Sequence, residues 1–126
     1  MTNQGTPDDI GDMYRSLYRD SAGLALPIIE GYERKVMALA CVDWNRDDYS
    51  EASAMFDALE AHVRELPGVQ QAWIEALISR AEFTQALWRA ELAGSGAEHL
   101  ARCEATHRAA LRRLAQQCRA LYGPAT

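Results

Sequence analysis

Apolar residues recur along the chain at steps of three and four, the spacing of one face of an α-helix. No stretch alternates with period two over more than a few residues, so no β-strand is predicted. Four long helices are predicted, over residues 27–42, 49–66, 69–92 and 95–122. A short helix over residues 6–20 is predicted to precede them and to be separated from the next helix by Gly23 and Pro27.

Polar residues and helix breakers mark the ends of these segments. Asp48 followed by Glu51, and Ser95 followed by Glu98, have the spacing of capping boxes at helix starts. Connections of three to six residues force neighbouring helices to run antiparallel. We therefore expect an all-α antiparallel four-helix bundle with an additional short N-terminal helix, as a single domain over residues 1–126 with flexible ends at 1–6 and 123–126.

The segment 69–92 is apolar on more than one face. One stripe is expected to face the core; it comprises Ile74, Leu77, Ile78, Ala81, Trp88 and Leu92. A second stripe is expected to bind a partner, unless the N-terminal helix covers it. Its predicted partner-binding residues are Val69, Ala72, Trp73, Ala76, Phe83 and Leu87. A helix with so wide an apolar surface is either enclosed by the core or presented to another chain.

The apolar stripe of the last helix carries the residues best suited to bind a metal or a cofactor. His99, Cys103 and His107 follow one another at four-residue steps and thus lie near one face. Cysteine and histidine are preferred zinc and copper ligands, but a row of three spans about 12 Å of helix axis, too long for one ion. With His62 from another helix, the candidate metal or haem ligands are His62, Cys103 and His107. The alternative is that Cys103 and His107 are core residues.

Arg102 and His107 resemble the arginine and histidine of the HEPN family, helical domains that include RNA-cleaving toxins. The similarity covers these two residues alone, since Cys103 and Ala109 replace the polar residue and tyrosine common in that family. This resemblance implies a ribonuclease in which Arg102 and His107 act.

Composition and charge narrow the class of partner. The chain is 48% hydrophobic with a net charge of -5, and it has neither an apolar run long enough for a membrane span nor a signal-peptide pattern. Three cysteines without a C-x-x-C pair suit reduced thiols, so we expect a cytoplasmic protein that does not bind membranes. The acidic net charge makes nucleic acid an unlikely partner. Twelve arginines and one lysine are typical of a GC-rich bacterial gene.

Acidic and basic residues are unevenly distributed along the chain. Residues 1–66 hold thirteen acids and six bases, and residues 67–126 hold five acids and seven bases. We therefore expect the two halves to attract each other when they pack.

The pattern as a whole favours a non-enzymatic protein-interaction module, such as an adaptor, small chaperone or regulator, that binds a protein partner or forms a homodimer. Size and layout are similar to those of small acidic export chaperones of secretion systems. No catalytic residue is assigned, and no cofactor is expected unless the candidate histidines bind a metal or haem.

Overall fold

The computed structural model describes residues 7–41 and 45–123, and these form four α-helices without a strand. The helices are α1 (Pro7–Leu39), α2 (Arg46–Val63), α3 (Gln70–Ala93) and α4 (Ala97–Tyr122). The predicted all-α class is thus confirmed. Residues 1–6 and 124–126, for which flexible ends are predicted, lie outside the described residues, and Gly123 is the C-cap of α4.

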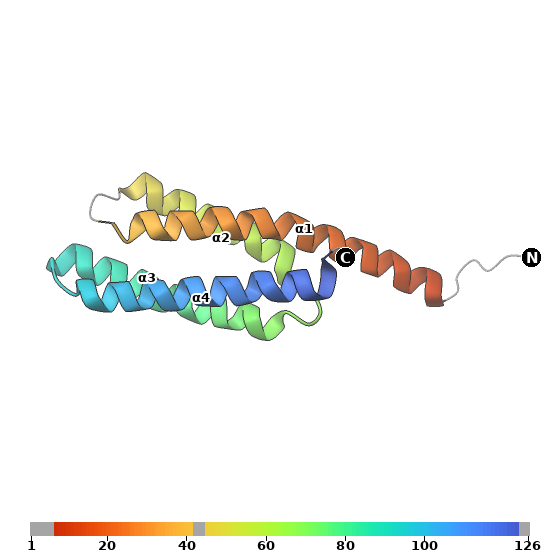
Figure 1. Ribbon diagram of the computed structural model, residues 1–126. Coiled ribbons are helices and arrows are strands. Elements are labelled where there is room, and N and C mark those ends of the chain that lie inside the picture. Colours follow the sequence, from red (N-terminus) through yellow and green to blue (C-terminus); the bar gives the residue numbers. More distant parts are fainter. Residues whose placement is uncertain (1–6, 42–44, 124–126) are drawn as a thin grey trace, which may run out of the picture.

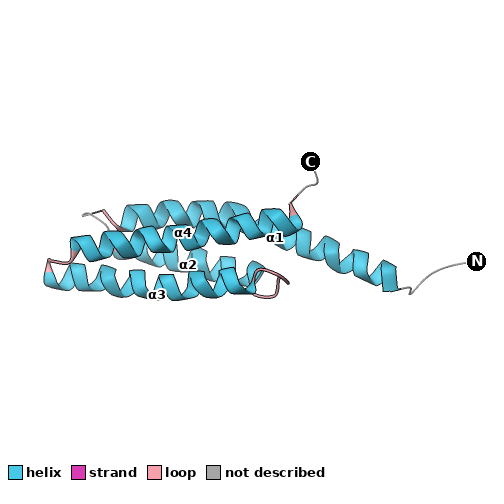
Figure 2. Ribbon diagram, turned by 60° about the horizontal axis from the view of Figure 1, so that its bottom comes forward, coloured by secondary structure: helices cyan, strands magenta, loops and turns pink. Residues whose placement is uncertain are grey.

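Successive helices run antiparallel and lie side by side as a bundle (Figure 1, Figure 2). α1 packs against α2 and α4, and α3 packs against α4. Within the described part of the chain, no helix has the length and apolar character needed to cross a membrane.

The predicted separate N-terminal helix is wrong, because α1 is continuous from residue 7 to residue 39 with Pro27 inside it. A proline removes one backbone hydrogen bond and leaves the carbonyl four residues earlier unpaired. That carbonyl belongs to Gly23, and both residues are on the exposed side of α1. On the other side, Ala22 and Ala25 are buried in the core. Burial of this face therefore outweighs the local cost of the proline.

The first turns of α1 extend beyond the end of the other three helices (Figure 1, Figure 2). We call residues 10–17 of this part the overhang. Its large apolar side chains are exposed; they are Ile10, Met13, Tyr14 and Leu17. Aromatic contacts link it to the end of α4, since Tyr14 stacks on Tyr18 and Tyr18 meets Tyr122 edge-on.

Two predicted caps differ from those in the structure. α2 begins at residue 46, and its capping box is formed by Asn45 and Asp48 instead of Asp48 and Glu51. Gly96 is the N-cap of α4 and makes no side-chain hydrogen bond, so the predicted cap at Ser95 is wrong. Glycines adopt the left-handed conformation on both sides of this turn, and that local geometry sets the start of the helix.

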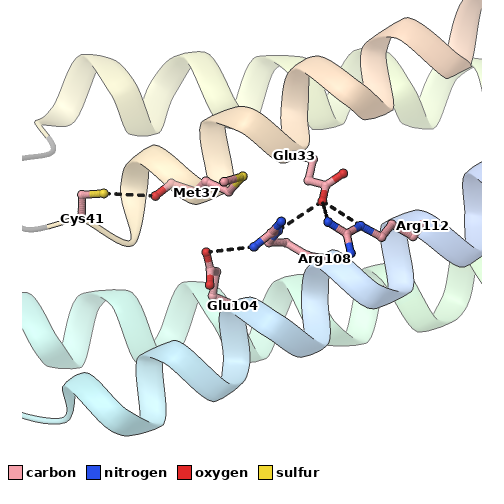
Figure 3. Close-up of polar contacts among 6 residues, drawn as sticks. All are labelled: Glu33, Met37, Cys41, Glu104, Arg108 and Arg112. Atoms are coloured by element: carbon pink, nitrogen blue, oxygen red, sulfur yellow. Dashed lines mark hydrogen bonds and ion pairs between the residues drawn. The ribbon is translucent and has the colours of Figure 1, made fainter.

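Ion pairs join the acidic first half of the chain to the basic last helix. Glu33 of α1 accepts hydrogen bonds from Nε of Arg108 and Nε of Arg112, both at 3.1 Å (Figure 3). Glu30 pairs with Arg119 at 3.5 Å. The expected attraction between the two halves is therefore present along the α1–α4 contact.

Candidate functional site

His107 lies in the centre of the bundle and contacts the three other helices. Its ring is fully buried. The Nε2 atom lies 2.9 Å from the hydroxyl of Tyr32 in α1, and the Nδ1 atom lies 2.7 Å from the hydroxyl of Ser79 in α3. The ring stacks on Phe83, with centroids 5.9 Å apart, and approaches Phe56 of α2 at 6.2 Å. His107 therefore connects all four helices through contacts in the interior of the bundle.

The hydrogen bonds assign a single tautomer to the His107 ring. The hydroxyl of Ser79 donates its proton to the carbonyl of Ala76 at 3.1 Å, so it accepts from Nδ1–H of the histidine. Nε2 is then unprotonated and accepts from the hydroxyl of Tyr32. This chain of hydrogen bonds satisfies every polar atom of the ring, and no buried side-chain nitrogen or oxygen within the described residues lacks a partner.

Burial and a nearby cation keep His107 neutral. Desolvation, together with the smaller effect of the charge of Arg80, lowers the pKa of the imidazole to about 4. The guanidinium of Arg80 lies over the ring of Phe56, 4.4 Å from its centroid, and beside the hydroxyl of Tyr32. Desolvation also raises the pKa of Tyr32, so the phenol stays protonated as a donor. The network is accordingly uncharged at neutral pH apart from Arg80.

This arrangement suits a structural role better than catalysis. A catalytic base must reach a substrate proton, but His107 is enclosed and both ring nitrogens are engaged. Ser79 is likewise buried, and its proton is committed to a backbone carbonyl. We conclude that the Ser79–His107 pair is a satisfied core network.

The predicted metal or haem ligands do not come together. His62 lies half-buried beside Leu17 and Ser21, near the C-terminal end of α2. Cys103 is half-buried, and its sulfur lies 3.6 Å from Nε2 of His99. His107 is in the core with no free nitrogen. Within the described residues, no three histidine, cysteine or acidic side chains form a cluster that could hold a metal ion.

Arg102 and His107 do not form a joint site either. Arg102 is exposed on the outer side of α4, and His107 faces the core. A ribonuclease needs both side chains at one accessible phosphate, and this geometry does not provide it.

The two apolar faces of α3 are correctly predicted as two stripes, but their assignment is reversed. The six predicted partner-binding residues are all buried in the protomer: Val69, Ala72, Trp73, Ala76, Phe83 and Leu87. Ala72 and Ala76 belong to the hydrophobic core. Trp73 stacks on Phe56 at 5.1 Å, and Phe83 stacks on His107. Contacts with α4 and with the aromatic side chains of the interior cover this stripe, and the N-terminal helix is not needed to do so.

The stripe that was predicted to face the core is exposed except for Trp88, which is half-buried and meets Tyr49 edge-on. We call the exposed residues of this stripe, together with Gln85, the outer face of α3; they are Ile74, Leu77, Ile78, Ala81, Gln85 and Leu92. Leu92 is the most exposed large apolar residue, at 83%, and Ile78 is 57% exposed. Glu82 and Arg89 lie on one flank of this face; both are exposed, and neither has an ion pair with another described residue. An apolar row flanked by unpaired charges is the kind of surface that binds another protein.

Sequence reasoning missed Tyr32, Ser79 and Arg80 as the partners of His107. One signal was available, because Ser79 stands at helical spacing within the stripe of Ala76 and Phe83 and is polar. A buried histidine needs a polar partner on a facing helix, and Ser79 is the one polar residue buried in α3.

Comparisons with known proteins give no further guide to function, since no family model, curated protein or solved structure matches the chain.

Proposed function

We propose that this protein is a non-enzymatic interaction module that binds an amphipathic protein helix on the outer face of α3. The observation that carries the proposal is the row Ile74, Leu77, Ile78 and Leu92, which points away from a core that is already complete. The row extends about 27 Å along the helix axis, at 1.5 Å per residue. A straight apolar row of this kind complements the apolar stripe of a second helix.

The exposed fractions of these four side chains give the strength of the driving force. They are 46%, 38%, 57% and 83%, equivalent to about two complete leucine or isoleucine side chains. Burial of one such side chain contributes about 1.5–3 kcal/mol. A partner helix could therefore gain about 3–6 kcal/mol from this face before its own apolar side chains are counted.

The interior supports a non-enzymatic role. The sole buried histidine of the described chain has both nitrogens engaged, and His62 and Arg102 lie away from it. The predicted export-chaperone or adaptor role would use the outer face of α3 in the same way, by covering an apolar segment of a client.

Site-specific photo-crosslinking tests the proposal. A photoreactive amino acid is placed at Ile78, and the matched control carries it at Gln116, an exposed position on α4. Both variants are irradiated as pure protein and in cell extract, and the crosslinked peptides are mapped by mass spectrometry. We expect protein adducts from position 78, mapped to an amphipathic helix, well above those from position 116. Equal or absent adducts at the two positions would overturn the proposal.

A further inference from the structure

We propose that the helix bound on the outer face of α3 is α3 of a second copy of this chain, running antiparallel about a two-fold axis at Gln85. The inference rests on the proposed function and adds the identity and register of the partner. In such a pair, residues equally far before and after Gln85 face each other. In this register, apolar residues of one copy meet apolar residues of the other, and acidic residues meet basic ones.

The two most exposed apolar residues of the outer face pair with each other in this register. Ile78 and Leu92 each lie seven residues from Gln85, on opposite sides, so Ile78 of one copy meets Leu92 of the other. Trp88 takes no part in this pairing, because it is half-buried and meets Tyr49 of its own protomer edge-on. This register gives Leu92, the most exposed apolar side chain, an apolar partner.

The charges on the flank are complementary in the same register. Glu82 lies three residues before Gln85 and Arg89 lies four residues after it. Positions seven residues apart differ by only about 20° around a helix, so both side chains lie on the same flank. In an antiparallel pair each flank meets the same flank of its partner, so Glu82 of one copy lies within one residue, about 1.5 Å along the axis, of the level of Arg89 of the other. The two-fold axis repeats this ion pair, and both residues lack a partner among the described side chains of their own protomer.

The extent of the contact fits a reversible dimer. Two antiparallel copies of α3 centred on Gln85 overlap over residues 77–93, about 24 Å, so their contact lies near the lower end of the size range for specific interfaces. We therefore expect a monomer–dimer equilibrium in the micromolar range instead of an obligate dimer.

A charge exchange tests both the partner and the register. Sedimentation equilibrium measures the dimer dissociation constant of the 14.0 kDa chain for the native protein, Glu82→Arg, Arg89→Glu and the double variant. Each single variant opposes like charges twice across the axis, so we expect the dissociation constant to rise about tenfold. The double variant restores opposite charges and is expected to lie within about threefold of the native value. Additive weakening in the double variant would overturn the proposed register.

The overhang of α1 provides the matched control. Leu17 is 55% exposed and Ile78 is 57% exposed, so aspartate at either position removes a similar apolar contact. We expect Ile78→Asp to abolish the dimer and Leu17→Asp to leave it intact; the reverse result would overturn the proposal. If the native chain stays monomeric at millimolar concentration but position 78 crosslinks to a helix of another protein, the second-copy inference fails and the proposed function stands. If it is monomeric and position 78 forms no adducts, both fail.

Discussion

Acid is expected to destabilise the protein through His107. The ordinary pKa of histidine is 6.5, and burial in the bundle lowers that of His107 to about 4. Between these values the unfolded chain binds a proton that the folded chain does not, so unfolding is favoured as the pH falls. The stabilising contribution of a neutral His107 is complete above pH 6.5, declines below it, and has been lost once the pH is below 4.

The size of the effect follows from the difference of about 2.5 pKa units. At about 1.36 kcal/mol per unit, linkage predicts a loss of about 2 kcal/mol at pH 5 and about 3 kcal/mol at pH 4, relative to pH 7. Single domains are typically stable by about 5–15 kcal/mol, so this loss is a substantial share of the total.

Urea unfolding between pH 7.5 and pH 4 measures this loss directly. The matched variant is His107→Gln, which retains a polar side chain but cannot take up a proton. Carboxylates common to both proteins contribute equally, so the difference between the two unfolding free energies isolates the histidine. We expect that difference to change by about 3 kcal/mol from pH 7 to pH 4. A difference that does not vary with pH would refute the reasoning.

Arg80 allows the two causes of the shift to be separated. The variant Arg80→Gln removes the charge beside His107 but leaves the ring buried. Because desolvation is the larger cause, we expect NMR titration of this variant to show a His107 pKa that rises but stays below 6.5. Recovery of the ordinary value would contradict the assignment of burial as the main cause.

Three further changes test the core and its ion pairs. Tyr32→Phe leaves Nε2 of His107 without a donor, and chemical denaturation should show a loss of about 1–3 kcal/mol; an unchanged stability would contradict the assigned tautomer. Phe83→Ala removes a fully buried ring and should cost about 3–5 kcal/mol, whereas Ile74→Asp on the outer face of α3 should change monomer stability by no more than about 0.5 kcal/mol. Equal losses of stability in these two variants would contradict the finding that the stripe with Phe83 is buried and the stripe with Ile74 is exposed. Glu33→Gln removes the negative charge shared by two arginines at an 18% exposed carboxylate, and we expect a loss of about 1 kcal/mol that shrinks as salt is added; a loss insensitive to salt would show that packing is responsible instead.

The helical architecture was predictable because apolar spacing reports directly on helix faces. The bounds of α3 and α4 agree with the prediction to within two residues. The continuity of α1 through Pro27 was not predictable, because a local rule about proline ignores the burial of the opposite face of α1. Ala22 and Ala25 hold that face against the core, and only the tertiary structure reveals it.

The two faces of α3 could not be ranked from the sequence. Both stripes are apolar, and their hydrophobicity does not say which one meets α4. The choice depends on fit, since Trp73 stacks on Phe56 and Phe83 stacks on His107. Such complementarity involves residues far apart in the chain, and periodicity within one helix carries no information about it.

Disulfide trapping at Gln85 tests the central claim, that the outer face of α3 binds a second copy, most directly. In a background with Cys41 and Cys103 replaced by serine, Gln85→Cys places one thiol of each copy at the two-fold axis, and Gln71→Cys places them about 40 Å apart. We predict that mild oxidation converts the Gln85→Cys variant to a covalent dimer of twice 14.0 kDa and leaves the Gln71→Cys variant monomeric. Equal crosslinking of the two variants, or none at position 85, would contradict the account.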